Sequence, residues 1–219
     1  MNIESEIAAY HSHRDDLLKR AATAVGLDPD VFVDKAIPQS ELFMAEIIRV
    51  LHDLYLSAPT NAKKTVLDVG PQSFGGTALL ERLHRNSSFN KLKLDVSAID
   101  ITNKFDLLRK VLCPNVKFIH SDVYADMPQV WDAIICSHVI EHVPGPQKFL
   151  KRLQQLARDF VLVACPWEEF PLSTSGHINT IGQALVDEVG GIDTKVFVNY
   201  NWGKARKVCI FWLPGLAGN

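Results

Sequence analysis

The sequence contains no long hydrophobic run. No stretch approaches the roughly 20 consecutive apolar residues that a membrane-spanning helix requires. The N-terminus, MNIESE, also lacks the basic and apolar regions of a secretion signal. These two absences argue against membrane contact and predict a cytoplasmic location.

An excess of charge of one sign is also missing. The 219 residues include 23 Lys and Arg against 25 Asp and Glu, which gives a formal net charge of -2. A nucleic-acid surface needs clustered basic residues, so we expect no nucleic-acid partner. Hydrophobic residues make up 47% of the chain, which is enough for a sizeable core. The length suits one domain with a modest appendage.

The cysteines form no recognisable metal or redox motif. They include no Cys-x-x-Cys pair, and three of them lie inside or at the end of apolar runs. Such cysteines usually pack as small buried hydrophobic side chains. The four residues are Cys113, Cys136, Cys165 and Cys209.

Two helices are expected in the N-terminal part of the chain. Apolar residues recur at spacings of three and four over residues 3–25, and Gly26 ends that pattern. A second helix should begin near Ser40, a suitable N-cap, and stop before Pro59. Residues 1–60 are therefore predicted to form a helical appendage, for which a lid, a homodimer contact and plain support are open roles.

From residue 65 onward, short β-rich apolar runs alternate with helical patterns. Parallel strands need a crossover long enough to hold a helix, so this order predicts an α/β fold. We expect a Rossmann-like, doubly wound sheet of seven mostly parallel strands over residues 61–219, with an antiparallel edge because the last two runs have a short connector. The expected strands are 65–69, 92–99, 116–119, 133–136, 160–164, 195–198 and 207–213, and the expected helices 77–84, 104–112, 146–157 and 181–189.

The first predicted strand leads into a glycine-rich loop. In open α/β sheets, ligands bind at the carboxyl ends of the strands. Counting from Gly70, the loop departs from G-x-G-x-x-G because Gln72 occupies the second glycine position. Pro71 also has no N–H to offer a pyrophosphate. The loop therefore argues against NAD and favours a ligand with an amine and a carboxylate, whose cation Asp68 would face.

Two more carboxylates stand at the ends of the next two strands. Asp100 ends the second strand, where an acidic residue typically accepts hydrogen bonds from two ribose hydroxyls. Asp122 follows the third strand, where it would accept from an adenine amino group. Each residue alone also suits a turn or a cap. Three acids at three consecutive strand ends favour a nucleoside-bearing cofactor.

Together with these acids, the segment WDAIICSHVIEHV at residues 131–143 resembles class I S-adenosylmethionine-dependent methyltransferases. The similarity covers residues 65 to about 180 and is closest to the branch with a hydrophobic-Glu-His-hydrophobic turn after a strand ending in Ser. It implies S-adenosyl-L-methionine as the cofactor. The cofactor contacts that the resemblance implies are Asp68, Gly70 and Gln72 at the methionine end, Asp100 and Ile101 at the ribose, Asp122 and Val123 at the adenine, and Ser137 and His138 beside the sulfonium.

Two short patterns suggest rival chemistry. His138-x-x-Glu141-His142 matches the H-x-x-E-H of inverted zinc proteases, but a Pro-Gly pair follows at once and the sequence singles out no third ligand. We therefore expect no metal ion. Tyr200-x-x-x-Lys204 matches short-chain dehydrogenases, but Asn-Trp-Gly inside it favours a turn over the helix that this pair needs.

The expected reaction is methyl transfer to a small-molecule acceptor, with a hydroxyl oxygen favoured. The Asp/Asn-Pro-Pro-aromatic signature of amino-methylating enzymes is absent after the fourth strand. His142 and His177 are the candidate bases because imidazole titrates near neutral pH, although either ring can instead brace a loop. Two alternatives stay open: an inactive methyltransferase-like scaffold, which the irregular loop 71–76 would permit, and a zinc hydrolase.

Overall fold

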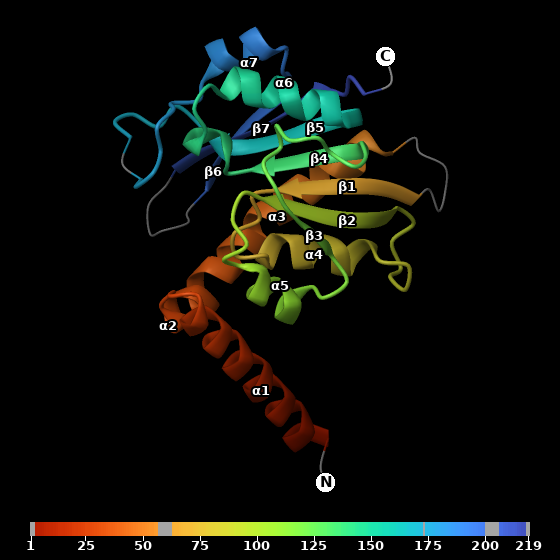
Figure 1. The fold of residues 1–219 in the computed structure, drawn as a ribbon, viewed down its shortest axis with the longest axis vertical. Coiled ribbons are helices and arrows are strands. Elements are labelled where there is room, and N and C mark those ends of the chain that lie inside the picture. Colours follow the sequence, from red (N-terminus) through yellow and green to blue (C-terminus); the bar gives the residue numbers. More distant parts are fainter. Residues whose placement is uncertain (1–2, 57–62, 173, 200–205, 218–219) are drawn as a thin grey trace.

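The computed structural model describes residues 3–56, 63–172, 174–199 and 206–217. Its centre is a seven-stranded sheet in the order β3-β2-β1-β4-β5-β7-β6 (Figure 1). The expected Rossmann-like α/β fold is confirmed. The strands are β1 Lys63–Val69, β2 Lys93–Asp100, β3 Lys117–His120, β4 Trp131–Ser137, β5 Ala157–Pro166, β6 Ile192–Asn199 and β7 Arg206–Pro214.

The sheet is parallel except at β7. This strand pairs antiparallel with β5 on one side and with β6 on the other. The predicted antiparallel pair is therefore confirmed, with β6 as the outermost strand. Because the other strands are parallel, the loops after β1, β2, β3 and β4 meet at one end of the sheet.

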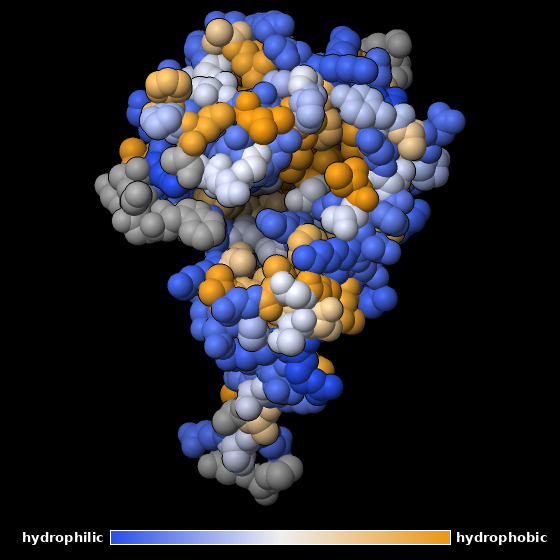
Figure 2. All heavy atoms as spheres, turned by 60° about the vertical axis from the view of Figure 1, so that its left-hand side comes forward, coloured by the Kyte–Doolittle hydropathy of each residue, from blue (hydrophilic) through white to orange (hydrophobic). Residues whose placement is uncertain are grey.

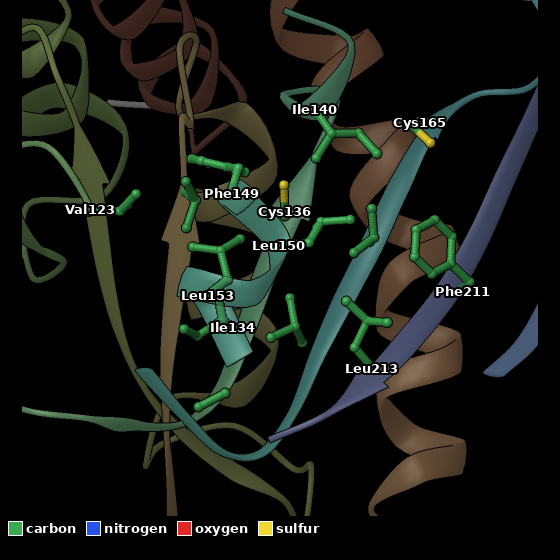
Figure 3. Packing of buried hydrophobic residues seen from close by; sticks show 14 of the residues in the cluster. Val123, Ile134, Cys136, Ile140, Phe149, Leu150, Leu153, Cys165, Phe211 and Leu213 are labelled. Carbon is green, nitrogen blue, oxygen red and sulfur yellow. The ribbon is translucent and has the colours of Figure 1, made fainter. Parts of the chain in front are cut away.

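Helices cover both faces of the sheet (Figure 1). Successive residues of a strand point to opposite faces, and β4 illustrates this: Ile134 packs in one core and Ile135 in the other. Figure 3 shows Leu150 and Leu153 of α6 packed over Ile134. The helices are α1 Ile3–Ala24, α2 Pro29–Val31, α3 Ile37–Leu54, α4 Gly75–His84, α5 Asp106–Leu112, α6 Pro146–Leu156 and α7 Gln183–Val189, with a π-helical turn η1 Phe32–Ala36 and a 3₁₀ turn η2 Ile140–His142.

The second N-terminal helical run begins earlier than the sequence predicted. The Asp28 side chain accepts hydrogen bonds from the N–H groups of Asp30 and Val31, both at 3.0 Å, and Pro29 is the first helical residue. The long helix expected to begin near Ser40 is α3, which begins at Ile37 with Pro38 in its first turn, because proline is tolerated there. Ser40 Oγ accepts a hydrogen bond of 2.9 Å from the Gly76 N–H.

The N-terminal helices differ in how they join the sheet. α1 projects away from the body of the molecule (Figure 1), and its C-terminal half packs through Leu18 and Ala22 against Leu108 of α5. α3 belongs to the core itself, since Ile47 and Leu51 are fully buried beside sheet residues. A division of the chain at residue 60 stays a prediction. Among the described helices, none is long and apolar enough to span a bilayer.

Candidate active site

A cavity of about 410 Å³ opens at the carboxyl ends of β1 and β4. Figure 2 brings this side of the molecule forward, and its surface is hollowed above the N-terminal helices. Four segments supply the walls. They are the N-terminal helices with Leu27, Phe32 and Phe43, the glycine loop with Gly70, Gln72 and Ser73, the turn after β4 with Ser137, His138, Glu141 and His142, and the loop after β5 and the start of β7 with Thr174, His177 and Arg206.

Gly70 is the residue of the loop whose geometry demands glycine. Its φ is +66°, in the left-handed region, and a Cβ there would lie 2.8 Å from Val139 Cγ2. The loop backbone therefore passes directly beside the turn after β4. Gly70 also lines the cavity, and its contact with a cofactor stays a prediction.

Gly75 and Gly76 have a packing role. A Cβ on Gly75 would lie 2.7 Å from the Ile37 carbonyl oxygen, and one on Gly76 would lie 2.9 Å from the Ser40 carbonyl oxygen. The two glycines therefore let α4 begin in direct backbone contact with α3. The later glycines of the loop thus serve helix packing, whereas the departure from G-x-G-x-x-G lies at Gln72, which has a positive φ of +38°.

Asp68 lies beneath the loop. Its side chain is only 3% exposed, and its Oδ2 accepts a 2.5 Å hydrogen bond from the Thr77 hydroxyl. Burial raises the pKa of Asp68 to about 7, although the bond from Thr77 lowers it. Asp68 does not line the cavity, so in this structure it connects β1 to the first turn of α4.

The predicted ribose and adenine residues lie at the same end of the sheet but outside the cavity walls. Asp100 is half-buried, and its Oδ1 accepts a 3.0 Å hydrogen bond from the Thr102 N–H. Burial raises the pKa of Asp100. Asp122 Oδ1 accepts a 2.9 Å bond from the Tyr124 N–H. Both carboxylates thus cap their own loops.

The two apolar residues of that set differ in exposure. The Ile101 side chain is 75% exposed, whereas Val123 is 5% exposed and packs in the core beneath α6. Ile101 is therefore free to contact a ligand from solvent, and Val123 supports the loop from below.

The turn after β4 places its residues around a buried carboxylate. His138 adopts a left-handed φ of +54° and stacks on Phe43, with ring centroids 3.9 Å apart. Its Nδ1 lies 3.3 Å from Oε1 of Glu141, which is 1% exposed. Ser137 precedes it on the cavity wall. Among the described residues, neither oxygen of the Glu141 carboxylate has a hydrogen-bond partner.

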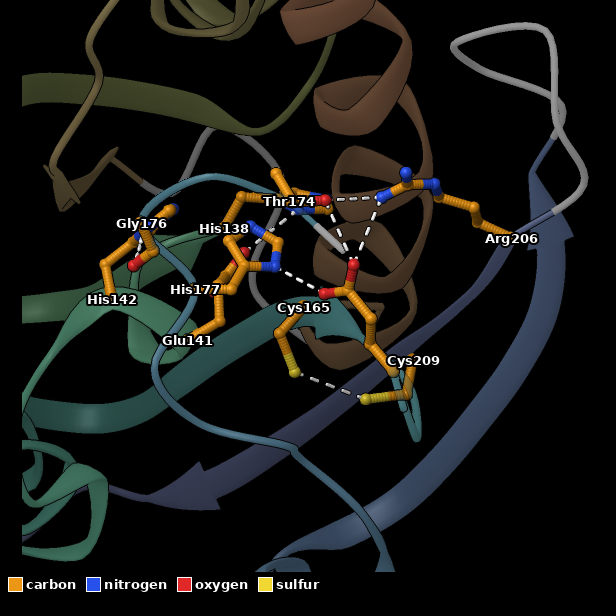
Figure 4. Close-up of polar contacts among 10 residues, drawn as sticks. His138, Glu141, His142, Cys165, Thr174, Gly176, His177, Arg206 and Cys209 are labelled. Atoms are coloured by element: carbon orange, nitrogen blue, oxygen red, sulfur yellow. Dashed lines mark hydrogen bonds and ion pairs between the residues drawn. The ribbon is translucent and has the colours of Figure 1, made fainter. Parts of the chain in front are cut away.

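The structure brings the two candidate bases together (Figure 4). His142 and His177 meet edge to face with ring centroids 4.7 Å apart. His142 Nδ1 lies 2.9 Å from the Gly176 carbonyl oxygen, and His177 Nδ1 bonds to the Glu169 carboxylate. Because a carbonyl and a carboxylate only accept, each neutral ring carries its proton on Nδ1 and its lone pair on Nε2.

Three residues of this network escaped the sequence analysis. Glu169 Oε1 accepts from the Thr174 hydroxyl at 3.0 Å and lies 3.3 Å from Arg206 Nη1, which also donates to Thr174 Oγ1 at 2.6 Å. The sequence feature that could have pointed to this network is the carboxylate pair Glu168-Glu169, just after the fifth strand. Nothing in the sequence links Arg206, the first residue of β7, to that pair. Tyr200 and Lys204 of the dehydrogenase-like pattern lie outside the described residues.

Backbone bonds attach this network to the turn after β4. The Glu141 carbonyl oxygen accepts from the Ile178 N–H at 2.8 Å and from the Asn179 N–H at 3.2 Å. The Asn179 side-chain amide donates to the carbonyl oxygens of Ile140 and Val143. The segment that carries His177 is therefore fixed beside η2.

Residues 40–166 match the family described as "Methyltransferase domain". The chain is also 32% identical over 94 residues to the mitochondrial ubiquinone biosynthesis O-methyltransferase of Schizosaccharomyces pombe. That match covers 42% of this chain and 33% of the relative. The chain therefore spans about a third of that relative's length.

Solved structures share the fold. The N-methyltransferase NodS of Bradyrhizobium japonicum WM9, in complex with S-adenosyl-L-homocysteine, aligns with a TM-score of 0.60 at 9% identity, over 90% of this chain and 98% of its own. The magnesium protoporphyrin IX methyltransferase ChlM of Synechocystis PCC 6803, with bound S-adenosylmethionine, aligns with a TM-score of 0.53 at 14% identity, over 77% and 78%. Since the family match covers more than half of the chain, this protein belongs to the methyltransferase domain family, and its resemblance to class I S-adenosylmethionine-dependent methyltransferases is confirmed.

Proposed function

We propose that this protein transfers a methyl group from S-adenosyl-L-methionine to a hydroxyl oxygen of a small molecule. The observation that carries the proposal is the pair of imidazoles in the cavity wall, each with its Nδ1 on an oxygen acceptor and a lone pair on Nε2. A cytoplasmic location and a homodimer contact stay predictions.

The residues at the carboxyl ends of the strands fit the cofactor. Gly70 has no Cβ, and a Cβ at this position would collide with Val139. The loop backbone at Gly70 is therefore accessible, which suits the amino acid end of the cofactor. Asp100 and Asp122 offer carboxylate oxygens that would accept from the ribose hydroxyls and the adenine amino group. Ser137 and His138 would lie beside the sulfur. The cofactor, when bound, supplies an electrophilic methyl group on a sulfonium centre.

The chain's own task is to orient the acceptor and to take its proton. His177 Nε2 accepts the proton of the hydroxyl, and the Glu169 carboxylate holds the ring and stabilises the imidazolium that forms. Thr174 and Arg206 keep Glu169 in place. Phe32 in the opposite wall limits the access of water.

The test is product analysis after incubation with the cofactor and a panel of phenols and aliphatic alcohols. Mass spectrometry should find an O-methylated product and one equivalent of S-adenosylhomocysteine. In buffer that contains a chelator, His177→Ala should lower kcat by about 10²–10⁴-fold and remove the acid limb of the pH–rate profile.

Two results would contradict the proposal. Cofactor binding with no methylated product from any acceptor would favour the inactive scaffold, and methylation confined to amines would reject oxygen as the acceptor atom. His13→Ala, an exposed histidine on α1, is the matched control and should leave kcat unchanged.

A further inference from the structure

We propose that Glu141, His142 and His177 bind one divalent transition-metal ion of the Zn²⁺ class inside the methyl-transfer cavity. One potential ligand atom from each of the three residues lies within 4.8 Å of the other two. The role assigned to the metal below, holding the acceptor oxygen, rests on the proposed methyl transfer. The binding itself is independent of it.

The donor set is the first argument. Two imidazoles and one carboxylate are the ligands of many catalytic zinc sites, which keep a fourth position open for substrate or water. Bonds of about 2.0–2.2 Å in a tetrahedron separate the donor atoms by about 3.4 Å. The potential ligand atoms, now within 4.8 Å of one another, therefore have to come closer together, which side-chain torsions can supply.

The hydrogen bonds of the two rings are the second argument. A metal-binding histidine usually donates its other N–H to a carbonyl or a carboxylate, which fixes the tautomer and orients the ring. His142 has the Gly176 carbonyl oxygen at 2.9 Å from Nδ1, and His177 has the Glu169 carboxylate. Both rings therefore present Nε2, the nitrogen with the lone pair, as the ligand atom.

The buried carboxylate is the third and independent argument. Glu141 is 1% exposed, and within the described part of the chain neither of its oxygens has a hydrogen-bond partner. Oε1 lies 3.3 Å from His138 Nδ1. Burying a carboxylate without compensation is costly. A cation shared with the two adjacent imidazoles would supply the missing compensation.

The structure also explains why sequence analysis predicted no metal. The pattern His138-x-x-Glu141-His142 lacked a third ligand in sequence. In the fold, the left-handed His138 turns its ring onto Phe43, and His177 comes beside Glu141 and His142 from the loop after β5. The expectation of no metal ion is therefore replaced by this proposal.

A cation here would act on the acceptor hydroxyl. A hydroxyl oxygen bound at the open position has a lowered pKa and loses its proton to solvent water. The oxygen then forms the bond to the methyl carbon, and the electron pair of the broken carbon–sulfur bond stays on sulfur. In the metal-free protein, His177 takes that proton instead, so the two routes predict different responses to a chelator.

The binding experiment uses the full chain after removal of metal with a chelator. Titration with Zn²⁺ by calorimetry should give one equivalent per chain, and Co²⁺ should give the visible absorption of a tetrahedral site. His177→Ala and His142→Ala should each weaken Zn²⁺ binding by more than 100-fold. Glu169→Gln alters the outer hydrogen bond of His177, together with the contacts of Glu169 to Thr174 and Arg206, and should weaken Zn²⁺ binding by about 10–100-fold. His13→Ala should bind like the wild type.

The overturning results are equally specific. A wild-type chain that binds no stoichiometric Zn²⁺, or a folded His177→Ala chain that binds it as tightly as the wild type, would refute the site. Circular dichroism checks that each variant is folded. If Zn²⁺ does not bind but O-methylation proceeds, this inference fails alone. If Zn²⁺ binds with the expected mutant pattern but no product forms, the proposed function fails alone.

Discussion

At the scale of single residues, Asp68 shows how burial changes a charge that the sequence presents as a cofactor contact. The unfolded chain releases this proton near the ordinary pKa of 3.8, and the folded chain holds it until about 7. A folded pKa above the unfolded one means that the folded state binds more protons over that interval. The free energy of unfolding should therefore fall as the pH rises through it.

Asp68→Asn should abolish that fall. Asparagine keeps an oxygen that accepts from the Thr77 hydroxyl and carries no charge at any pH. We expect the variant to gain stability relative to the wild type by up to about 1.4 kcal/mol per pH unit between about pH 4 and 7. Urea unfolding of both proteins across that range measures the difference. If the exposed control Asp95→Asn changed the pH dependence of stability in the same way, burial of Asp68 would not be the cause of that dependence.

Asp100 tests the cofactor assignment at the same scale. Asp100→Ala should weaken binding of S-adenosylhomocysteine by about 1.5–3 kcal/mol, the range for a hydrogen bond to a charged group. The fold should persist because the side chain is only half-buried at a strand end. Calorimetry compares this variant with Asp95→Ala, which removes a carboxylate from the same strand. Equal affinities in the two folded variants would remove Asp100 from the ribose site.

At the scale of elements, the contact between α3 and α4 depends on two glycines. Gly76→Ala would place a methyl group 2.9 Å from the Ser40 carbonyl oxygen, and backbone cannot yield as a flexible side chain does. We expect destabilisation by about 1–3 kcal/mol, measured by urea unfolding. In Gly182→Ala the new Cβ would meet only Glu168 Cγ, at 3.5 Å, an ordinary contact. This control should change stability little, and an equal loss in both variants would contradict the packing argument.

The elements of the sheet were largely predictable from sequence. The central part of β5, FVLVAC, is a continuous apolar run, so the position of this strand follows from composition, although the strand itself begins earlier and includes Arg158 and Asp159. The helical residues from Pro29 onward were not predicted, because proline is compatible both with the end of one helix and with the first residue of another, and the cap from Asp28 shows which applies here.

The site was less predictable than the sheet. His142 and His177 were identified individually, but their contact depends on the path of the loop between them, where Gly176 and Glu169 bind the rings. Arg206, which forms an ion pair with Glu169 in that network, comes from β7, a strand near the end of the chain. Sequence spacing carries no information about such pairings, because they are set by the tertiary fold.

At the scale of the whole molecule, α1 projects away from the body that contains the sheet (Figure 1). The N-terminal half of this helix exposes Ile3, Ile7 and Tyr10, which are 66%, 51% and 66% exposed, whereas Leu18 near its other end is 2% exposed. Leu18→Ala should therefore cost about 2–5 kcal/mol of unfolding free energy, and Ile7→Ala should cost less than about 0.5 kcal/mol. Thermal unfolding of the two variants shows whether the C-terminal half of α1 contributes to stability while the N-terminal half does not. Equal losses would show that the outer half of α1 is also packed.

The position of β7 sets the order in which this protein can be completed during synthesis. β6 is made before β7, but every pair that β6 forms in the sheet is with β7, which also lies between it and β5. Until residues 206–214 have left the ribosome, β5 has an open edge and β6 has no strand to join, and open edges invite pairing with other chains. The wall of the cavity that Arg206 helps to build is likewise finished last. A released chain truncated after residue 205 should therefore be cut by protease within β6, and the full-length chain should be protected there.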